Sequence, residues 1–307
     1  MKTAIVGPGA IGLLYYYLLS RKESNICMLD KTRKRAGELK KRGFIIEIDK
    51  EKHTIPINIC TEAKEIGIAD LILICVKSYD SKKAARSIRE IANKNTIVLS
   101  LQNGLGNIEI MQKELPQCRV ISAVTNLGST LLATGHIRYA GKGPTYIGGD
   151  VQRSKLTGIA KLFSSCSIEA TVTDNIESAL WSKLIINAGI NALTAILRIT
   201  NGDILTSPSA SILMEQAVTE AHKIAKAKNI PILYDDPLAK VRDVCTRTAH
   251  NRSSMLQDVE RRKKTEIDAI NKAVYTHGRK MKLSAPVNEM LAGIVKAVEE
   301  AYGRSVR

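Results

Sequence analysis

Aromatic residues are scarce in this chain: Phe, Trp and Tyr together make up 4% of its 307 residues. Proteins that hold single-stranded nucleic acid usually stack the bases on aromatic side chains. The 46 basic residues outnumber the 30 acidic ones and give a net charge of +16, but they are spread over many helical segments. Such an excess attracts small polyanions as readily as nucleic acid. We therefore expect an anionic small-molecule ligand and no nucleic-acid partner.

Paired cysteines and uninterrupted apolar runs are missing as well. The six cysteines form no C-x-x-C pair and have no histidine at zinc-finger spacing, so we expect structural thiols and no bound metal. No uninterrupted apolar stretch approaches the roughly 20 residues that a transmembrane helix needs. The N-terminus also lacks the basic segment and cleavable apolar segment of a secretory signal. These absences predict a cytoplasmic protein without a membrane partner.

Glycines follow the first predicted strand, at residues 3–6. Gly7, Gly9 and Gly12 have the spacing G-x-G-x-x-G and precede an apolar helical segment at 11–19. In this arrangement the first glycine allows a tight turn, the second lets a pyrophosphate approach the backbone, and the third lets the helix pack on the sheet. The pyrophosphate then lies at the helix N-terminus. We predict a dinucleotide site here; the alternative is a glycine-rich turn without a ligand.

The residue after the second predicted strand bears on which dinucleotide is bound. Asp30 ends that strand, where an acidic side chain commonly binds a ribose hydroxyl and repels a 2′-phosphate. Four basic residues follow at once and suit a 2′-phosphate: Lys31, Arg33, Lys34 and Arg35. The residues alone leave NADH and NADPH open.

The order of segments predicts two different halves. Up to about residue 173, short apolar segments alternate with amphipathic ones, the pattern of a parallel βαβ sheet, with a β-hairpin inserted at 44–59. From residue 175 onward the chain reads as helices, several of them bounded by proline. The predicted fold is α/β: a doubly wound sheet in residues 1–173 and an all-α domain in residues 174–307.

A row of polar residues interrupts the first apolar helix of the second half. Lys183, Asn187 and Asn191 recur every four residues and therefore share one helix face. Burying an ammonium and two amides is costly without partners, so the row predicts a ligand cleft. A solvated polar stripe is the alternative. Asn103 and Lys77 each follow a buried strand, at the edge where open α/β sheets bind ligands, although a turn or a solvated loop would also explain them.

Two later segments match helix caps by spacing. Ser254 lies in the first, after Asn251, and Glu266 lies in the second, between Thr265 and Asp268. Serine and threonine at such positions commonly accept hydrogen bonds from the first backbone N–H groups of a helix. From spacing alone, capping explains both segments better than catalysis does.

Together these segments resemble the ketopantoate reductase (2-dehydropantoate 2-reductase) family over essentially the whole chain. The matching segments are 7–12, 75–77, 101–107, 181–191, 200–202, 253–258 and 265–268. The resemblance implies a Rossmann-type domain followed by a helical domain, with NADPH as the favoured cofactor and NADH left open by Asp30. The implied reaction is hydride transfer to 2-dehydropantoate, giving (R)-pantoate on the path to pantothenate and coenzyme A. A reductase of another small 2-keto acid and a non-catalytic nucleotide-sensing protein are the alternatives.

The resemblance also implies roles for single residues and an expected homodimer. Lys183 is the implied general acid, and Glu266 the second catalytic group, which contacts the substrate hydroxyl or orients the lysine. The implied substrate-binding residues are Asn103, Asn187, Asn191, Asn201, Asn251 and Ser254. The implied cofactor-binding residues are Gly7, Pro8, Gly9, Ala10, Ile11, Gly12, Asp30, Lys31, Lys77, Asn103 and Glu266.

Overall fold

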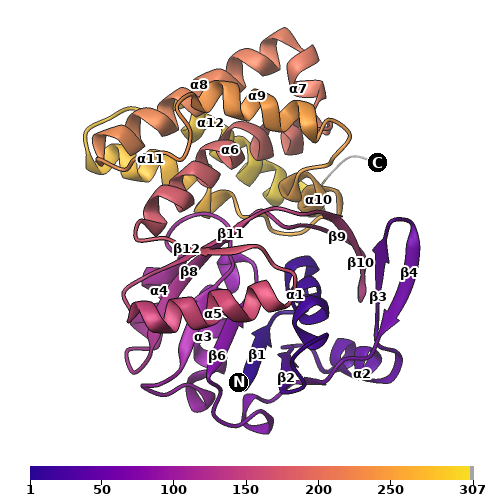
Figure 1. Cartoon of the computed structure of the whole chain (residues 1–307). Helices are drawn as coiled ribbons and strands as arrows, with labels where there is room; N and C mark the ends of the chain where they lie inside the picture. Colours follow the sequence, from indigo (N-terminus) through magenta and orange to yellow (C-terminus); the bar gives the residue numbers. More distant parts are fainter. Residues whose placement is uncertain (305–307) are drawn as a thin grey trace. The chain divides into compact units, whose positions relative to one another are not determined.

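The structure, a computed structural model, describes residues 1–304 and divides into two compact units (Figure 1). The first unit comprises residues 1–102 and 107–176. The second comprises the chain from residue 177 onward together with the short loop 103–106. A division of the sequence at residue 174 places this loop in the first half, whereas the structure packs it with the helices.

An eight-stranded sheet forms the centre of the first unit, in the order β12-β11-β8-β7-β6-β1-β2-β5. Its strands are β1 (Thr3–Val6), β2 (Ile26–Leu29), β5 (Ile59–Cys60), β6 (Leu71–Ile74), β7 (Ile97–Ser100), β8 (Arg119–Thr125), β11 (Thr145–Gly148) and β12 (Ala170–Val172). All neighbours pair in parallel except β8 and β11. Strand β1 lies between β2 and β6, so the strand order reverses beside it. In open α/β sheets, ligands bind at the carboxyl ends of the strands at this reversal.

Helices cover both faces of this sheet. They are α1 (Ala10–Ser20), α2 (Arg33–Arg42), α3 (Ser81–Ser87), α4 (Asn107–Glu114) and α5 (Arg153–Ser165), with 3₁₀ turns at 63–65, 78–80 and 89–91. Side chains alternate along β6: Leu71 and Leu73 belong to the core that includes α1 and α5, and Ile72 to the core that includes α3 and α4. A strand apolar on both faces is what a sheet covered on both sides requires. The predicted doubly wound sheet is confirmed.

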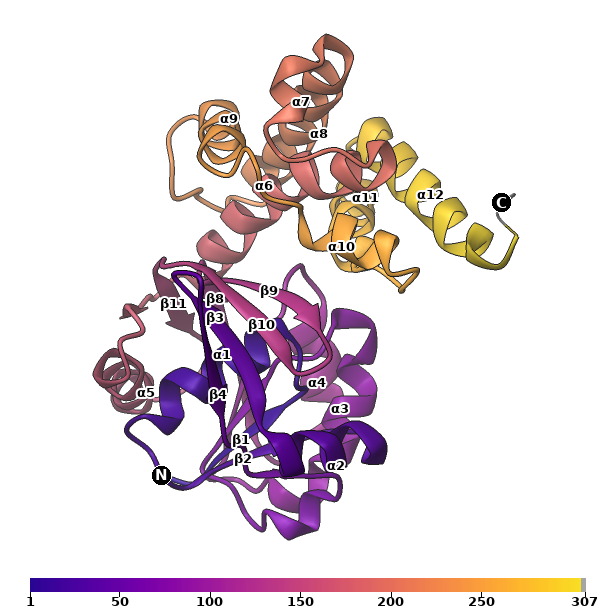
Figure 2. The same cartoon turned by 90° about the vertical axis from the view of Figure 1, so that its right-hand side faces the viewer.

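A smaller sheet adjoins α1 within the first unit (Figure 2). Its strands are β3 (Phe44–Ile48), β4 (Glu51–Ile55), β9 (Gly128–Ala133) and β10 (His136–Gly141), in the order β4-β3-β10-β9. The antiparallel pair β3–β4 confirms the predicted hairpin. Its second strand ends at Ile55 rather than Ile59, because Ile59 and Cys60 pair with β2 in the main sheet.

The second unit is helical throughout its described part, as predicted. Its helices are α6 (Ile176–Leu197), α7 (Asp203–Thr206), α8 (Pro208–Ala227), α9 (Pro237–Arg247), α10 (Ser254–Glu260), α11 (Asn271–Lys280) and α12 (Pro286–Glu300), with 3₁₀ turns at 267–269 and 301–303. Proline opens α8, α9 and α12, at a position where its missing N–H has no helical partner to lose. The core gathers around α6, whose Trp181 and Ile185 are almost fully buried.

Helix α6 is long and apolar enough to cross a membrane, by length and composition alone. Such a segment is not expected from uninterrupted apolar runs alone, because the polar row of α6 breaks any such run. In the structure, 67% of the most apolar window of α6 is buried against the protein itself. Its apolar character is therefore explained by its place in the core of the helical unit.

Candidate active site

The glycine-rich turn connects β1 to α1. Gly7 has a φ of +101°, and a Cβ atom on it would lie 2.7 Å from the Val76 side chain. A Cβ atom on Gly12 would lie 2.0 Å from the backbone oxygen of Gly7, so the helix can pack this closely only with glycine here. A Cβ atom on Gly9, the N-cap of α1, would have no heavy atom within 4 Å. The protein's own packing does not demand glycine at this position, and the open space fits the approach of a pyrophosphate to the N-terminus of α1.

Asp30, at the carboxyl end of β2, is paired within its own turn. The residue is 1% exposed, and its carboxylate accepts hydrogen bonds from Arg35 Nε at 2.6 Å and Arg35 Nη2 at 2.5 Å. The backbone N of Thr32 donates to the same carboxylate at 3.1 Å. These hydrogen bonds raise the pKa of the Arg35 guanidinium. Asp30 therefore forms a neutralised pair with Arg35 and does not present a bare negative charge, a pairing that the sequence alone does not predict.

Lys31 and Lys77 lie at the carboxyl edge of the main sheet. The Nζ atom of Lys31 pairs with Asp80 at 2.7 Å, joining the turn after β2 to the 3₁₀ turn after β6. Lys77 immediately precedes that 3₁₀ turn and is partly buried. It is not a fully solvated loop lysine.

Lys183 projects from α6 into a partly buried environment. Burial lowers its pKa from the ordinary value to about 8, and the negative charge of Glu266 opposes this shift. Asn187 is also partly buried, and Asn191 is 6% exposed. The polar row is therefore not a solvated stripe.

The neighbouring turns of α6 are anchored by hydrogen bonds. The Ser182 hydroxyl accepts from the backbone N of Leu233 at 2.9 Å, and the Tyr234 hydroxyl donates to the Ser182 carbonyl. Further along the helix, the hydroxyl of Thr194 lies 2.7 Å from that of Ser253. These contacts fix the helix at both ends of the polar row.

The segment before α10 corrects one prediction. Ser253, not Ser254, is the N-cap of α10, since its hydroxyl accepts from the backbone N of Leu256 at 3.1 Å. Ser254 is the first helical residue and is exposed. Capping therefore does not account for Ser254. The reason is tertiary: the contact with Thr194 selects which of two adjacent serines faces the helix.

Asn201 and Asn251 are brought together by a backbone hydrogen bond of 3.0 Å from the N of Asn201 to the carbonyl of Asn251. Asn201 is 8% exposed, and its Nδ2 donates to Thr248 at 2.9 Å. Its Oδ1 is buried and accepts no hydrogen bond from the described residues. A buried acceptor of this kind suits a donor group on a ligand. Asn251 itself is exposed.

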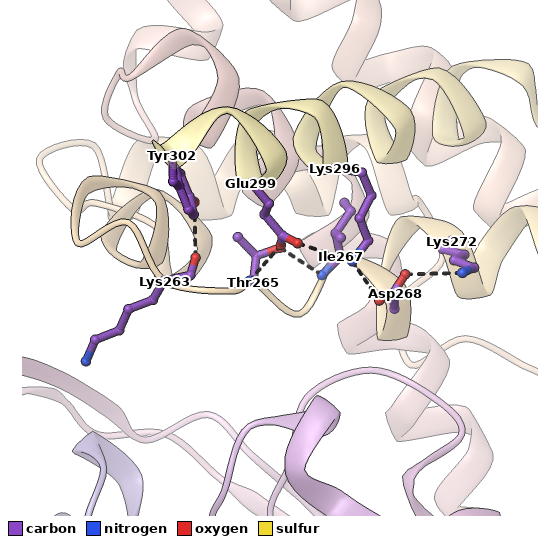
Figure 3. Close-up of polar contacts among 8 residues, drawn as sticks. All are labelled: Lys263, Thr265, Ile267, Asp268, Lys272, Lys296, Glu299 and Tyr302. Carbon is purple, nitrogen blue, oxygen red and sulfur yellow. Dashed lines mark hydrogen bonds and ion pairs between the residues drawn. The ribbon is translucent and has the colours of Figure 1, made fainter. Parts of the chain in front are cut away.

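Glu266 is 5% exposed and precedes the 3₁₀ turn 267–269. The predicted cap is only half present: the backbone N of Ile267 donates to the Thr265 hydroxyl at 3.2 Å, but Asp268 pairs with Lys296 instead of capping (Figure 3). Since Glu266 itself makes no side-chain cap, capping does not explain it.

The loop 103–106 rests on the segment that carries Glu266. The backbone N of Leu105 donates to the carbonyl of Ala269 at 2.9 Å. A Cβ atom on Gly104, whose φ is +80°, would lie 2.2 Å from the same oxygen. Asn103 is therefore held close to the Glu266 segment. On the other side of Ala269, Asn271 donates from Nδ2 to the carbonyl of Ala188 on α6 at 3.0 Å. One short segment thus links Asn103 to the helix of Lys183.

Residues 3–150 match the family model described as "Ketopantoate reductase PanE/ApbA", and residues 175–299 match "Ketopantoate reductase PanE/ApbA C terminal". The chain belongs to the ketopantoate reductase family.

Relatives within the ketopantoate reductase family align over nearly the whole chain. A 2-dehydropantoate 2-reductase from Pyrococcus horikoshii is 34% identical over 99% of this chain and 100% of its own length. One from Halobacterium salinarum is 31% identical over 97% of this chain and 99% of its own. A solved PanE/ApbA family ketopantoate reductase from Ralstonia eutropha has a TM-score of 0.90 at 28% identity, covering 98% of this chain and 99% of that one.

Gln102 is a buried polar residue next to Asn103 that sequence reasoning did not single out. It is 8% exposed, and its Nε2 donates to the carbonyl of Val76 at 3.0 Å and to the Ser81 hydroxyl at 2.8 Å. The hydroxyl of Ser100 donates to its Oε1 at 3.0 Å. Gln102 thus fixes the backbone next to Lys77. The available signal was an amide directly after a buried strand, beside Asn103.

Proposed function

We propose that this ketopantoate reductase family member reduces 2-dehydropantoate to (R)-pantoate with NADPH, in pantothenate and coenzyme A biosynthesis. The observation that carries the proposal is the partly buried Lys183, with a pKa near 8 and Glu266 as its electrostatic partner. Relatives named 2-dehydropantoate 2-reductase that align end to end support the same substrate.

The residues of the helical unit suit this chemistry. A nicotinamide cofactor, when bound, supplies the hydride for the ketone carbon. Lys183 stabilises the developing alkoxide as a cation and then donates a proton to it. A pKa near 8 keeps the lysine protonated at neutral pH while leaving the proton easy to transfer. Glu266 contacts the substrate hydroxyl and sustains the charge of Lys183. The residues that hold the substrate are Asn103, Asn187, Asn191, Asn201, Asn251 and Ser254.

The sheet unit is proposed as the dinucleotide-binding part, with residues 1–173 as one domain and 174–307 as the substrate domain. Gly7–Gly12 receive the pyrophosphate, and Lys31 and Lys77 lie at the same sheet edge. NADPH is favoured over NADH because Arg35 neutralises Asp30 and leaves the surrounding turn basic. Asn103 and Glu266 complete the proposed contacts with the cofactor.

We also propose a cellular location and an oligomeric state for the enzyme. We place it in the cytoplasm, with a small 2-keto acid as its partner. A homodimer is proposed on the basis of exposed apolar residues on α12, Met290 at 62% and Ile294 at 40% exposed. Light scattering of the purified protein measures this directly.

A panel of small 2-keto acids, each assayed with NADPH and NADH, tests the proposal. We expect the highest kcat/KM for 2-dehydropantoate with NADPH, and loss of turnover in Lys183→Met. Faster turnover of another 2-keto acid would instead identify a related reductase. Nucleotide binding without turnover of any acid would favour a nucleotide-sensing protein.

A further inference from the structure

The end of helix α12 binds Thr265, the residue before Glu266 (Figure 3). The Oε1 atom of Glu299 accepts hydrogen bonds from the backbone N of Thr265 at 2.7 Å and from its hydroxyl at 2.6 Å. The same hydroxyl accepts from the backbone N of Ile267 at 3.2 Å. Thr265 is 1% exposed, and the side chain of Glu299 is 12% exposed. Glu299 therefore binds Thr265 directly, and Thr265 in turn binds the residue on the other side of Glu266.

Lys296 fixes the orientation of Glu299. Its Nζ lies 3.2 Å from Oε2 of Glu299 and 2.8 Å from Oδ2 of Asp268, and Lys272 pairs with the other Asp268 oxygen at 3.3 Å (Figure 3). With Oε2 turned toward Lys296, Oε1 is left to face Thr265. We call Thr265, Asp268, Lys296 and Glu299 the α12 clamp.

Helix stability alone does not favour a carboxylate at Glu299. It lies in the last turn of α12, next to Glu300, where the helix macrodipole is negative and cations are preferred. The contacts with Thr265 and Lys296 offset this repulsion. The carboxylate therefore connects its own helix, through Lys296, to the Glu266 segment, through Thr265.

We propose that Glu299 is a positioning residue that, through Thr265, holds Glu266 at its working distance from Lys183. Without the carboxylate, the buried N–H and hydroxyl of Thr265 lose their acceptor, and the segment must shift to find another. A displacement of about 1 Å in a catalytic group can cost on the order of 100-fold in rate. Because Ala269 ends the same segment and receives Leu105, such a shift also reaches the loop of Asn103.

The expected loss of activity rests on the proposed function, whereas the position of Glu266 relative to Lys183 can be followed without a substrate. Glu266 raises the pKa of Lys183 against the effect of burial, so moving Glu266 away lowers that pKa. Lysine-selective ¹³C NMR of the full-length protein, with Lys183 assigned from the Lys183→Met variant, follows the titration. Besides Asp268, Lys272, Lys296 and Glu299, the charged residues on α12 are Glu289 and Glu300, and Lys263 and Lys264 precede Thr265.

The informative variants are Glu299→Ala, Thr265→Val and Thr265→Ser. Glu299→Ala removes the acceptor, and Thr265→Val removes the hydroxyl while keeping the shape of the side chain. We expect both to move the titration of Lys183 below pH 8 and to lower kcat/KM by about 10- to 100-fold. Thr265→Ser retains the hydroxyl and should stay close to wild type. Glu289→Ala on α12, which breaks an exposed pair with Arg279 of α11, is the matched control.

A purely structural role for Glu299 would lower activity equally at every pH and leave the titration of Lys183 in place. An unchanged titration in Glu299→Ala and Thr265→Val, with a lowered one in Glu266→Gln, overturns the positioning role. An unchanged titration in Glu266→Gln overturns it as well, since the two groups would then not be coupled. If Glu299→Ala does not fold, the comparison of Thr265→Val with Thr265→Ser tests the positioning role instead. If no 2-keto acid is reduced, the proposed function fails, while the titration still decides the role of Glu299.

Discussion

Asp30 and Arg35 form a two-pronged ion pair between the end of β2 and the first turns of α2, with N–O distances of 2.6 and 2.5 Å. The side chain of Asp30 is 0% exposed and that of Arg35 is 33% exposed. An acidic residue at this position is usually associated with NADH. Because Arg35 neutralises it here, the acid does not by itself determine the preference for a cofactor.

Replacing Arg35 should expose the charge of Asp30. We expect Arg35→Ala to lower kcat/KM for NADPH relative to NADH by about tenfold or more, equivalent to about 1.4 kcal/mol. Asp30→Ala should change the ratio in the opposite direction. Steady-state kinetics with both cofactors measures the ratio, and Lys41→Ala, an exposed change at the far end of α2, is the control. Equal losses for both cofactors would show that the pair only stabilises the turn.

The three glycines of the β1–α1 turn should respond differently to alanine. Gly9→Ala has room in the protein and a φ of −85° that alanine accepts, so we expect wild-type stability but weaker dinucleotide binding. Gly12→Ala places its Cβ against the Gly7 oxygen and should destabilise the fold by about 1–3 kcal/mol. Denaturant unfolding and calorimetric NADPH titration separate the two effects. Normal NADPH affinity in Gly9→Ala would show that the pyrophosphate does not bind at this turn.

The pH dependence of the reaction should report the state of Lys183. A general acid acts only when protonated, so kcat/KM should fall as the pH rises through about 8, the value to which burial lowers its pKa. Lys183→Ala should reduce kcat by about 10²–10⁴-fold and abolish this alkaline limb. The measurement is a pH–rate profile at saturating cofactor. An alkaline limb that persists in Lys183→Ala would belong to another group.

An ion pair of the small sheet should make the stability of the fold depend on acid pH. Glu47 on β3 is bonded to Arg138 Nε at 2.9 Å and to His136 Nε2 at 3.0 Å on β10, and these contacts lower its pKa. A carboxylate with a lowered folded pKa stabilises the protein above its unfolded pKa, and this contribution is lost as the pH falls through the folded value. Urea unfolding midpoints should therefore differ between wild type and Glu47→Gln at pH 7 and converge in acid. Glu51→Gln, 80% exposed on the adjoining strand, should show no such convergence.

The elements of the fold were predictable because their signals are local. The apolar run before Gly7, the glycine spacing and the four-residue period of Lys183, Asn187 and Asn191 all depend on neighbours in the sequence. The site also depends on contacts that cross the sequence, such as Leu105 with Ala269 and Thr265 with Glu299. No periodic pattern in the sequence predicts these two contacts. The prediction of Ser254 as a cap was wrong for the same reason, because the cap is Ser253, which contacts Thr194 on another helix.

The short loop 103–106 limits how the protein can be dissected genetically. The chain enters the helical unit at this loop and then returns to the sheet unit, where it forms β8, β9, β10, β11 and β12. It enters the helical unit again after residue 176. A fragment starting at residue 177 would lack the amide of Leu105 that the Ala269 carbonyl accepts. Expressing the halves from separate plasmids should therefore yield an incomplete helical fragment, unless a linker restores those four residues.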